Sequence, residues 1–183
     1  MIKMKSPSLA INSYDVPGPN YKMWQTVNAS KGMTPVSLLG EILRVNEVAL
    51  QYKQKPLQNI VINCHGGDGR LYIGGLDYPP MDINNIGIFS VLKTGDIGTI
   101  WLVACEVLAS GFGKRFCQSL AMTSGSEVVA ADVNQDVGPW SSLRIYTSWT
   151  RGLIDDYEGT VFSFRADGSN GIIDPKEDIF TAD

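Results

Sequence analysis

The sequence is short of the residues on which many active sites and scaffolds depend. It has a single histidine, His65, and three cysteines, Cys64, Cys105 and Cys117. No two of these cysteines form a CxxC pair, and an odd number cannot all be joined to one another. The counts argue against a disulfide framework and favour a reducing compartment. Any catalytic pair that needs a histidine must use His65.

Concentrated positive charge and long apolar runs are also missing. The net charge is −4, and Lys and Arg form no sizeable cluster along the sequence. Because nucleic acid binding rests on concentrated cationic charge, we do not expect a nucleic acid partner. No apolar run reaches the ~20 residues that span a bilayer, so we expect no membrane span.

The first residues lack the apolar stretch and cleavage site of a secretory signal. We therefore expect a cytoplasmic protein, or one exported as an effector or toxin by a route that reads no such signal. With 183 residues, 44% of them hydrophobic, the chain suits one domain, 1–183, with a core of its own.

Short apolar runs alternate with helix-spaced apolar residues as far as residue 131. This alternation predicts an α/β fold with a mostly parallel sheet and helices on both faces. Two further strands and a turn are expected beyond it. The predicted strands are 8–14, 58–64, 98–104, 127–131, 142–150 and 159–166, with a short strand or hairpin at 70–75; the predicted helices are 35–53, 83–92 and 108–122; the predicted turn is 167–171.

Two of the predicted strands end in reactive side chains. Residues 59–64 are followed by His65-Gly66-Gly67, and the run 100–104 is followed by Cys105. The carboxyl ends of parallel strands form the ligand-binding edge of an α/β sheet. A cysteine and a histidine that meet there are a candidate nucleophile and base.

The pair resembles the caspase-like cysteine peptidases, which include caspases, clostripain, gingipains, legumain and the self-cleaving domain of large bacterial toxins. Members carry His-Gly after one strand and a Cys, often preceded by Ala, after the next parallel strand; the matches are His65-Gly66 and Ala104-Cys105, and the likeness covers roughly residues 8–135. The sequence after Cys105, Glu106-Val107, departs from the caspase signature. The resemblance therefore implies a distant bacterial-type member, with a three-layer α/β/α sandwich.

This resemblance implies a cysteine endopeptidase that cleaves protein or peptide substrates through an acyl-enzyme thioester. Cys105 is the expected nucleophile, activated by the nearby imidazole and by the start of the following helix. His65 is the expected general acid and base. The backbone N–H groups of Gly66 and Cys105 are the expected oxyanion donors. The chemistry needs no cofactor, and no third catalytic residue stands out.

The position of the substrate pocket follows from the resemblance as well. In the superfamily it is lined by residues near the His loop and after the strand that follows the Cys helix. Asp68, Asp132 and Asp136 occupy those places, and a carboxylate there would favour Arg or Lys before the cleaved bond. Solvated loop acids are the simpler interpretation of all three. Trp140 and Trp149 are candidate pocket walls, although core packing explains at least one of them as well.

Other chemistries fit the sequence less well. An α/β-hydrolase needs Gly-x-Ser-x-Gly and a second histidine, and the chain has neither. Gly66–Gly69 lacks the Lys-Ser/Thr ending of a phosphate loop, and no spacing suggests a fourth ligand for a zinc site at Cys64, His65 and Cys105. A catalytically silent caspase-like binding or regulatory module remains the alternative. Cys64 and Cys117 are expected to be structural.

Overall fold

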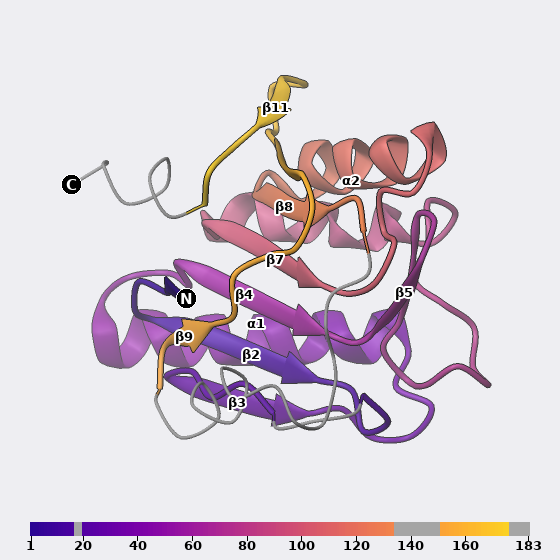
Figure 1. Ribbon diagram of the computed structural model, residues 1–183. Helices are drawn as coiled ribbons and strands as arrows, with labels where there is room; N and C mark the ends of the chain where they lie inside the picture. The colour runs from indigo at the N-terminus through magenta and orange to yellow at the C-terminus, as the bar shows by residue number, and fades with distance from the viewer. Residues whose placement is uncertain (17–19, 134–150, 176–183) are drawn as a thin grey trace.

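The computed structural model describes residues 1–16, 20–133 and 151–175 (Figure 1). Seven strands form its central sheet in the order β11–β10–β8–β7–β4–β2–β3. Five neighbouring strands, β3, β2, β4, β7 and β8, run parallel, and β10 and β11 continue the sheet antiparallel. This confirms the predicted α/β class and mostly parallel central sheet. The bounds are β2 (Ser8–Asn12), β3 (Gln25–Asn28), β4 (Asn59–Asn63), β7 (Thr99–Val103), β8 (Glu127–Ala131), β10 (Val161–Phe164) and β11 (Asn170–Ile172).

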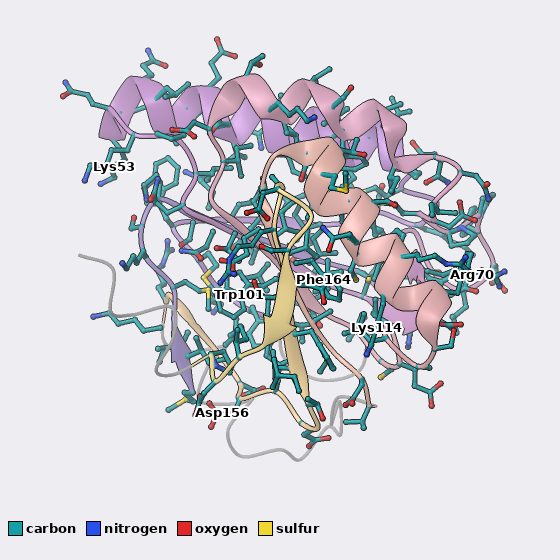
Figure 2. The ribbon with its side chains drawn as sticks, turned by 90° about the horizontal axis from the view of Figure 1, so that it is seen from above. Lys53, Arg70, Trp101, Lys114, Asp156 and Phe164 are labelled. Carbon is teal, nitrogen blue, oxygen red and sulfur yellow. The ribbon has the colours of Figure 1, made fainter. Side chains whose placement is uncertain are left out.

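Three helices cover one face of this sheet: α1 (Pro35–Lys53), the 3-10 helix η1 (Ile86–Gly95) and α2 (Gly111–Ser124) (Figures 1 and 2). They lead from β3 to β4, from β4 to β7 and from β7 to β8, always in the same direction across the sheet. Because crossovers between parallel strands are right-handed, connections that advance in one direction lie on one face. Only the connection from β2 to β3 runs the other way, and its described residues, 13–16 and 20–24, contain no helix.

Extended segments cover the opposite face. β1 (Ile2–Lys3) pairs antiparallel with β9 (Leu153–Ile154), and Ile2 and Ile154 of this pair share a buried cluster with Tyr21, Met23 and Trp101. The sequence predicted helices on both faces, as in a three-layer sandwich. The described residues differ, since their helices all lie on one face. The segment 134–150, which holds the predicted strand 142–150, lies outside the described residues.

Helix α1 spans the residues predicted for it because the sequence marks both of its ends. The Thr34 side chain accepts a hydrogen bond from the Ser37 N–H at 3.2 Å, and Pro35 opens the helix. Gln54 ends it in the left-handed region with φ 55°. The prediction for α2 began three residues too early, because residues before Gly111 form a turn.

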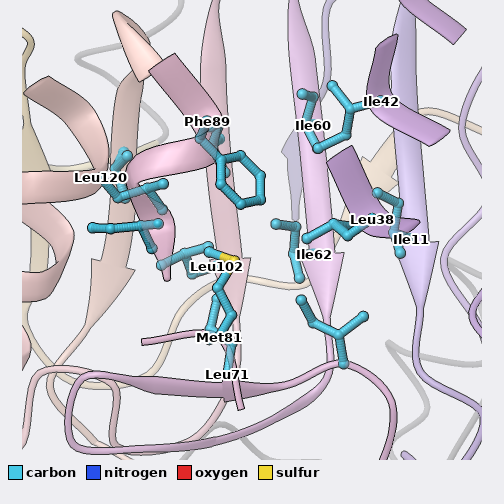
Figure 3. Close-up of a cluster of buried hydrophobic side chains, with 14 of the residues drawn as sticks. Ile11, Leu38, Ile42, Ile60, Ile62, Leu71, Met81, Phe89, Leu102 and Leu120 are labelled. Atoms are coloured by element: carbon cyan, nitrogen blue, oxygen red, sulfur yellow. The ribbon is translucent and has the colours of Figure 1, made fainter. Parts of the chain in front are cut away.

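The core lies between the sheet and the helices, and it fixes the two strands that matter for the site. Every residue of β4 and of β7 is buried. On the helix side Ile60, Ile62 and Leu102 pack under the helices (Figure 3). The helices contribute Leu38 and Ile42 from α1, Phe89 from η1 and Leu120 from α2 (Figure 3). Two strands held this firmly present their carboxyl ends at a fixed separation.

Candidate active site

His65 and Cys105 lie beside each other at the carboxyl edge of the sheet. β4 and β7 are neighbours in parallel register, with Asn63 opposite Val103, so each reactive residue lies two positions beyond the last pair. The contact is tightest at Gly66, where a Cβ would lie 2.3 Å from the Cys105 carbonyl oxygen and 3.0 Å from its nitrogen. The structure therefore brings the backbones of the two predicted dyad residues together, and the pairing of their side chains stays a prediction.

Asp15 joins the pair from a third strand end, and the sequence analysis missed it. It follows β2, the other neighbour of β4, and its carbonyl oxygen lies 3.2 Å from His65 Nε2. Its carboxylate Oδ2 lies 4.0 Å from the same nitrogen, and the Ser13 hydroxyl donates to Oδ1 at 2.6 Å. Because a carbonyl oxygen only accepts, Nε2 carries the proton in this hydrogen bond. Nδ1 is then the basic nitrogen of the neutral ring.

The His loop is a hairpin that leaves the Gly66 N–H available. β5 (His65–Gly67) pairs antiparallel with β6 (Arg70–Tyr72), which confirms the hairpin expected beside His65. Gly66 lies opposite Leu71, but the N–H and C=O of Leu71 both bond to Met81, at 3.0 and 2.8 Å. Since pairing alternates along an antiparallel ladder, the Gly66 N–H points away from β6. This N–H is one of the two predicted oxyanion donors, the other being that of Cys105.

A sharp turn carries Cys105. The residue after it, Glu106, has φ 52°, a left-handed conformation that is rare for a side chain with a Cβ. Such strained positions cluster at functional sites. The turn ends at Ser110, whose hydroxyl accepts from the Phe112 N–H at 3.0 Å and so begins α2.

The structure gives Asp68 a contact that the sequence did not predict. Its carboxylate lies on the start of α2, where Oδ1 accepts from the backbone N–H groups of Ser110 and Gly113. A carboxylate at this place offsets the positive end of the helix dipole. The expected help from the helix to a Cys105 thiolate is reduced accordingly. A role for Asp68 in substrate binding stays a prediction.

A hollow of about 400 Å³ lies next to the Cys105 turn, lined by Leu108, Ala109, Ser110, Gly111, Lys114, Asp132 and Val133. The Glu106 N–H donates to the Val133 carbonyl at 3.4 Å, which ties the hollow to the residue after Cys105. Asp132 thus lies near the dyad, with its Oδ1 accepting from the Thr160 N–H at 2.8 Å. The other candidate pocket residues, Asp136, Trp140 and Trp149, lie outside the described residues.

The three thiols differ in how deeply they are buried, and none of them is in a disulfide. Cys64 and Cys117 are buried in the core under the helices, whereas Cys105 is partly exposed. Desolvation raises the pKa of both buried thiols; for Cys64 a hydrogen bond from the Tyr72 backbone opposes the rise only in part. Cys105 is the thiol that a substrate can reach.

Among residues 1–16, 20–133 and 151–175, no three His, Cys, Asp or Glu side chains are grouped closely enough to hold a metal ion. Within the same part of the chain, no helix has the length and apolar character needed to cross a membrane. No model of a protein family matches the sequence, and neither the curated proteins nor the solved structures include a significantly similar one.

Proposed function

We propose that the chain is a cysteine endopeptidase of the caspase-like type, with Cys105 as nucleophile and His65 as general acid and base. One observation carries the proposal. Three adjacent parallel strands, β2, β4 and β7, deliver Asp15, His65 and Cys105 to one edge of the sheet, with Gly66 packed on the Cys105 backbone. The strand order reverses at β2, and open α/β sheets bind their ligands at such a point.

The geometry supports a two-stage reaction. The Cys105 Sγ attacks the substrate carbonyl carbon while its proton passes to His65 Nδ1. The N–H groups of Gly66 and Cys105 stabilise the negative charge that forms on the carbonyl oxygen. His65 then protonates the leaving amine, and the C–N bond breaks to leave a thioester.

Water completes the cycle. His65 takes a proton from the attacking water, the thioester carbon–sulfur bond breaks, and the thiolate of Cys105 is regenerated with release of a carboxylic acid. Throughout, the Asp15 carbonyl holds Nε2 and so keeps Nδ1 turned to the reaction. No cofactor enters any of these steps. Three reduced thiols suit work in a reducing compartment, in the cytoplasm or after export into another cell.

The partner is a protein or peptide whose chain crosses this edge of the sheet. The hollow beside the Cys105 turn is the place for one substrate side chain, and Asp132 is the described carboxylate on its wall. We expect a basic side chain to be preferred there, because a carboxylate pairs with Arg or Lys. Both oxygens of Asp68 bond to Ser110 or to the start of α2, which makes Asp132 the stronger candidate for this role.

Cleavage of a peptide library, followed by mass spectrometry, tests the proposal with four purified proteins. Wild type and the Cys117→Ser control should cut the same bonds, whereas Cys105→Ala and His65→Ala should lose activity by a factor of about 10³ or more. Cleavage that survives Cys105→Ala would contradict the assignment.

Alkylation by iodoacetamide tests the site without a substrate. A thiol paired with an imidazolium reacts even at about pH 6, where an ordinary thiol does not. We expect such reactivity at Cys105 of the wild type and its loss in His65→Ala. A wild type with neither cleavage nor this reactivity would be the silent binding or regulatory module instead.

A further inference from the structure

The hairpin that begins with His65 is attached to the turn that begins with Cys105 at three successive points. The first is the contact of Gly66 with the Cys105 backbone. The second is a hydrogen bond of 3.0 Å from the Gly69 N–H to the Val107 carbonyl. The third is the Asp68 carboxylate at the start of α2. Together they join two segments that lie some 40 positions apart in the sequence.

Asp68 contributes the charged contact of this junction, and it does so with both oxygens. Oδ1 accepts from the Ser110 N–H at 3.1 Å and from the Gly113 N–H at 2.9 Å, and Oδ2 accepts from the Ser110 hydroxyl at 2.5 Å. Hydrogen bonds to an ionised carboxylate are about twice as strong as those between neutral groups. One side chain thus holds the hairpin tip to the helix that follows Cys105.

The neighbouring glycines show that the junction is closely fitted. A Cβ on Gly113 would lie 1.9 Å from the Val107 carbonyl oxygen and 2.8 Å from Asp68 Oδ1. Gly69, with φ +66°, would bring a Cβ within 2.7 Å of the Phe112 ring. Gly113 therefore lacks a side chain where the Asp68 carboxylate reaches the start of α2, and Gly69 lacks one where the hairpin lies on the Phe112 ring, as expected where a close approach is required.

We infer that Asp68 is a positioning residue of the dyad, which sets His65 against Cys105 by clamping the His hairpin to the start of α2. The inference rests on the proposed function. It differs from simple helix capping, because Ser110 already caps α2 through the Phe112 N–H. Without the Asp68 carboxylate, α2 keeps that cap, but the hairpin tip loses three hydrogen bonds and the imidazole is no longer fixed beside the thiol.

The test compares the rate of Cys105 alkylation by iodoacetamide against pH in four proteins. Asp68→Ala should lose the reactivity at about pH 6 that the wild type shows, because the imidazolium is displaced. Asp167→Ala is the matched control, since it removes a carboxylate that accepts from the Ser169 N–H and hydroxyl within the exposed turn after β10; it should keep the wild-type profile. Asp68→Asn retains an oxygen for the two amides and should restore the profile.

Peptide cleavage gives the second measurement. A displaced dyad lowers kcat, by about 100-fold for a misplacement of ~1 Å, while KM stays within about twofold. Equal profiles for Asp68→Ala and Asp167→Ala, whether both wild-type or both impaired, would overturn the clamp. If Asp68→Ala does not fold by circular dichroism, Asp68→Ser replaces it, with one hydroxyl as the remaining acceptor. Failure of the proposed function is a separate result, because the wild type itself would then be unreactive.

Discussion

At the scale of single residues, Gly66 is a position where an added methyl group would collide with backbone, that of Cys105. A Cβ there would lie 2.3 Å from the Cys105 carbonyl oxygen, which is backbone and cannot turn aside. We expect Gly66→Ala to lower the free energy of unfolding by about 1–3 kcal/mol, as overpacking does, and to abolish peptide cleavage by moving the hairpin. Urea denaturation and kcat/KM measure the two effects.

The next residue supplies the control. A Cβ on Gly67 would meet only the Tyr72 ring, at 3.9 Å, which is ordinary contact. Gly67→Ala should therefore remain within about 0.5 kcal/mol of the wild type. Equal stability and activity of the two variants would show that Gly66 does not lie against Cys105 as described.

The sequence analysis found His65 and Cys105 because each follows an apolar run, a signal that is local to the chain. Asp15 gave no such signal. It follows the predicted strand 8–14, but its contact with His65 depends on β2 lying next to β4, although β3 and α1 intervene in the sequence. The bonds of Asp68 to Ser110 and Gly113 depend in the same way on a long-range approach. The types of the site residues can be read from a sequence, whereas the contacts between residues far apart in the chain depend on the order of the strands in the sheet.

At the scale of elements, buried amides hold the β2–β3 connection that carries Asp15. Asn12 is fully buried, donates to the Tyr21 carbonyl at 3.1 Å and accepts from the Tyr21 N–H at 3.0 Å and from Asn63 Nδ2 at 3.0 Å. Asn12→Ala would leave these buried partners without a hydrogen bond to the Asn12 side chain. We therefore expect a loss of about 3 kcal/mol in the free energy of unfolding.

Asn20→Ala is the matched control, and urea denaturation is again the measurement. The Asn20 amide donates to Asn28 at 3.1 Å in an exposed pair, and its loss should change stability by no more than about 0.5 kcal/mol. Similar losses in both variants would mean that Asn12 does not hold the connection. If Asn12→Ala also loses the alkylation of Cys105 that depends on His65, the Asn12 hydrogen bonds help to place Asp15 against His65.

Elements with strong local signals were predicted well, and weak ones were missed. Helix α1 has a capping threonine, a proline at its start and a regular apolar stripe, and its predicted bounds are confirmed. The edge strand β3 alternates between half-buried and exposed residues, and no strand was predicted there. Its residues give no clear strand pattern of their own, and it forms a strand because it pairs with β2.

At the scale of the whole molecule, the arrangement of connections explains where the site lies. The chain enters the central sheet at β2, moves out to the edge strand β3, and returns across β2 to β4 before continuing to β7 and β8. Open α/β sheets bind their ligands at the carboxyl ends of the strands beside such a reversal, and Asp15 and His65, which follow β2 and β4, lie in contact there. Cys105 then follows from β7, the next strand in the same direction.

The buried thiols give the folded molecule a dependence on alkaline pH that can be measured. Burial raises the pKa of Cys64 and of Cys117 in the folded state, so both keep their protons where the unfolded chain has lost them. Above the unfolded value of about 8.5 the unfolded state binds fewer protons, and stability falls as pH rises, by about 1.4 kcal/mol per pH unit for each thiol. Below that pH both thiols are protonated in the folded and the unfolded chain, so they cause no change of stability with pH.

Comparison with Cys117→Ala isolates this effect from the titration of other groups. The variant loses one of the two thiols, and alanine suits the interior of α2, where Cys117 lies. Urea denaturation of both proteins with a reductant should show an unfolding free-energy difference that is constant from about pH 7 to 8. Between about pH 9 and 10 the difference should shift against the wild type by about 1.4 kcal/mol. A difference that stays constant across the whole range would mean that Cys117 ionises as readily in the folded chain as in the unfolded one, and that it does not lie in the core.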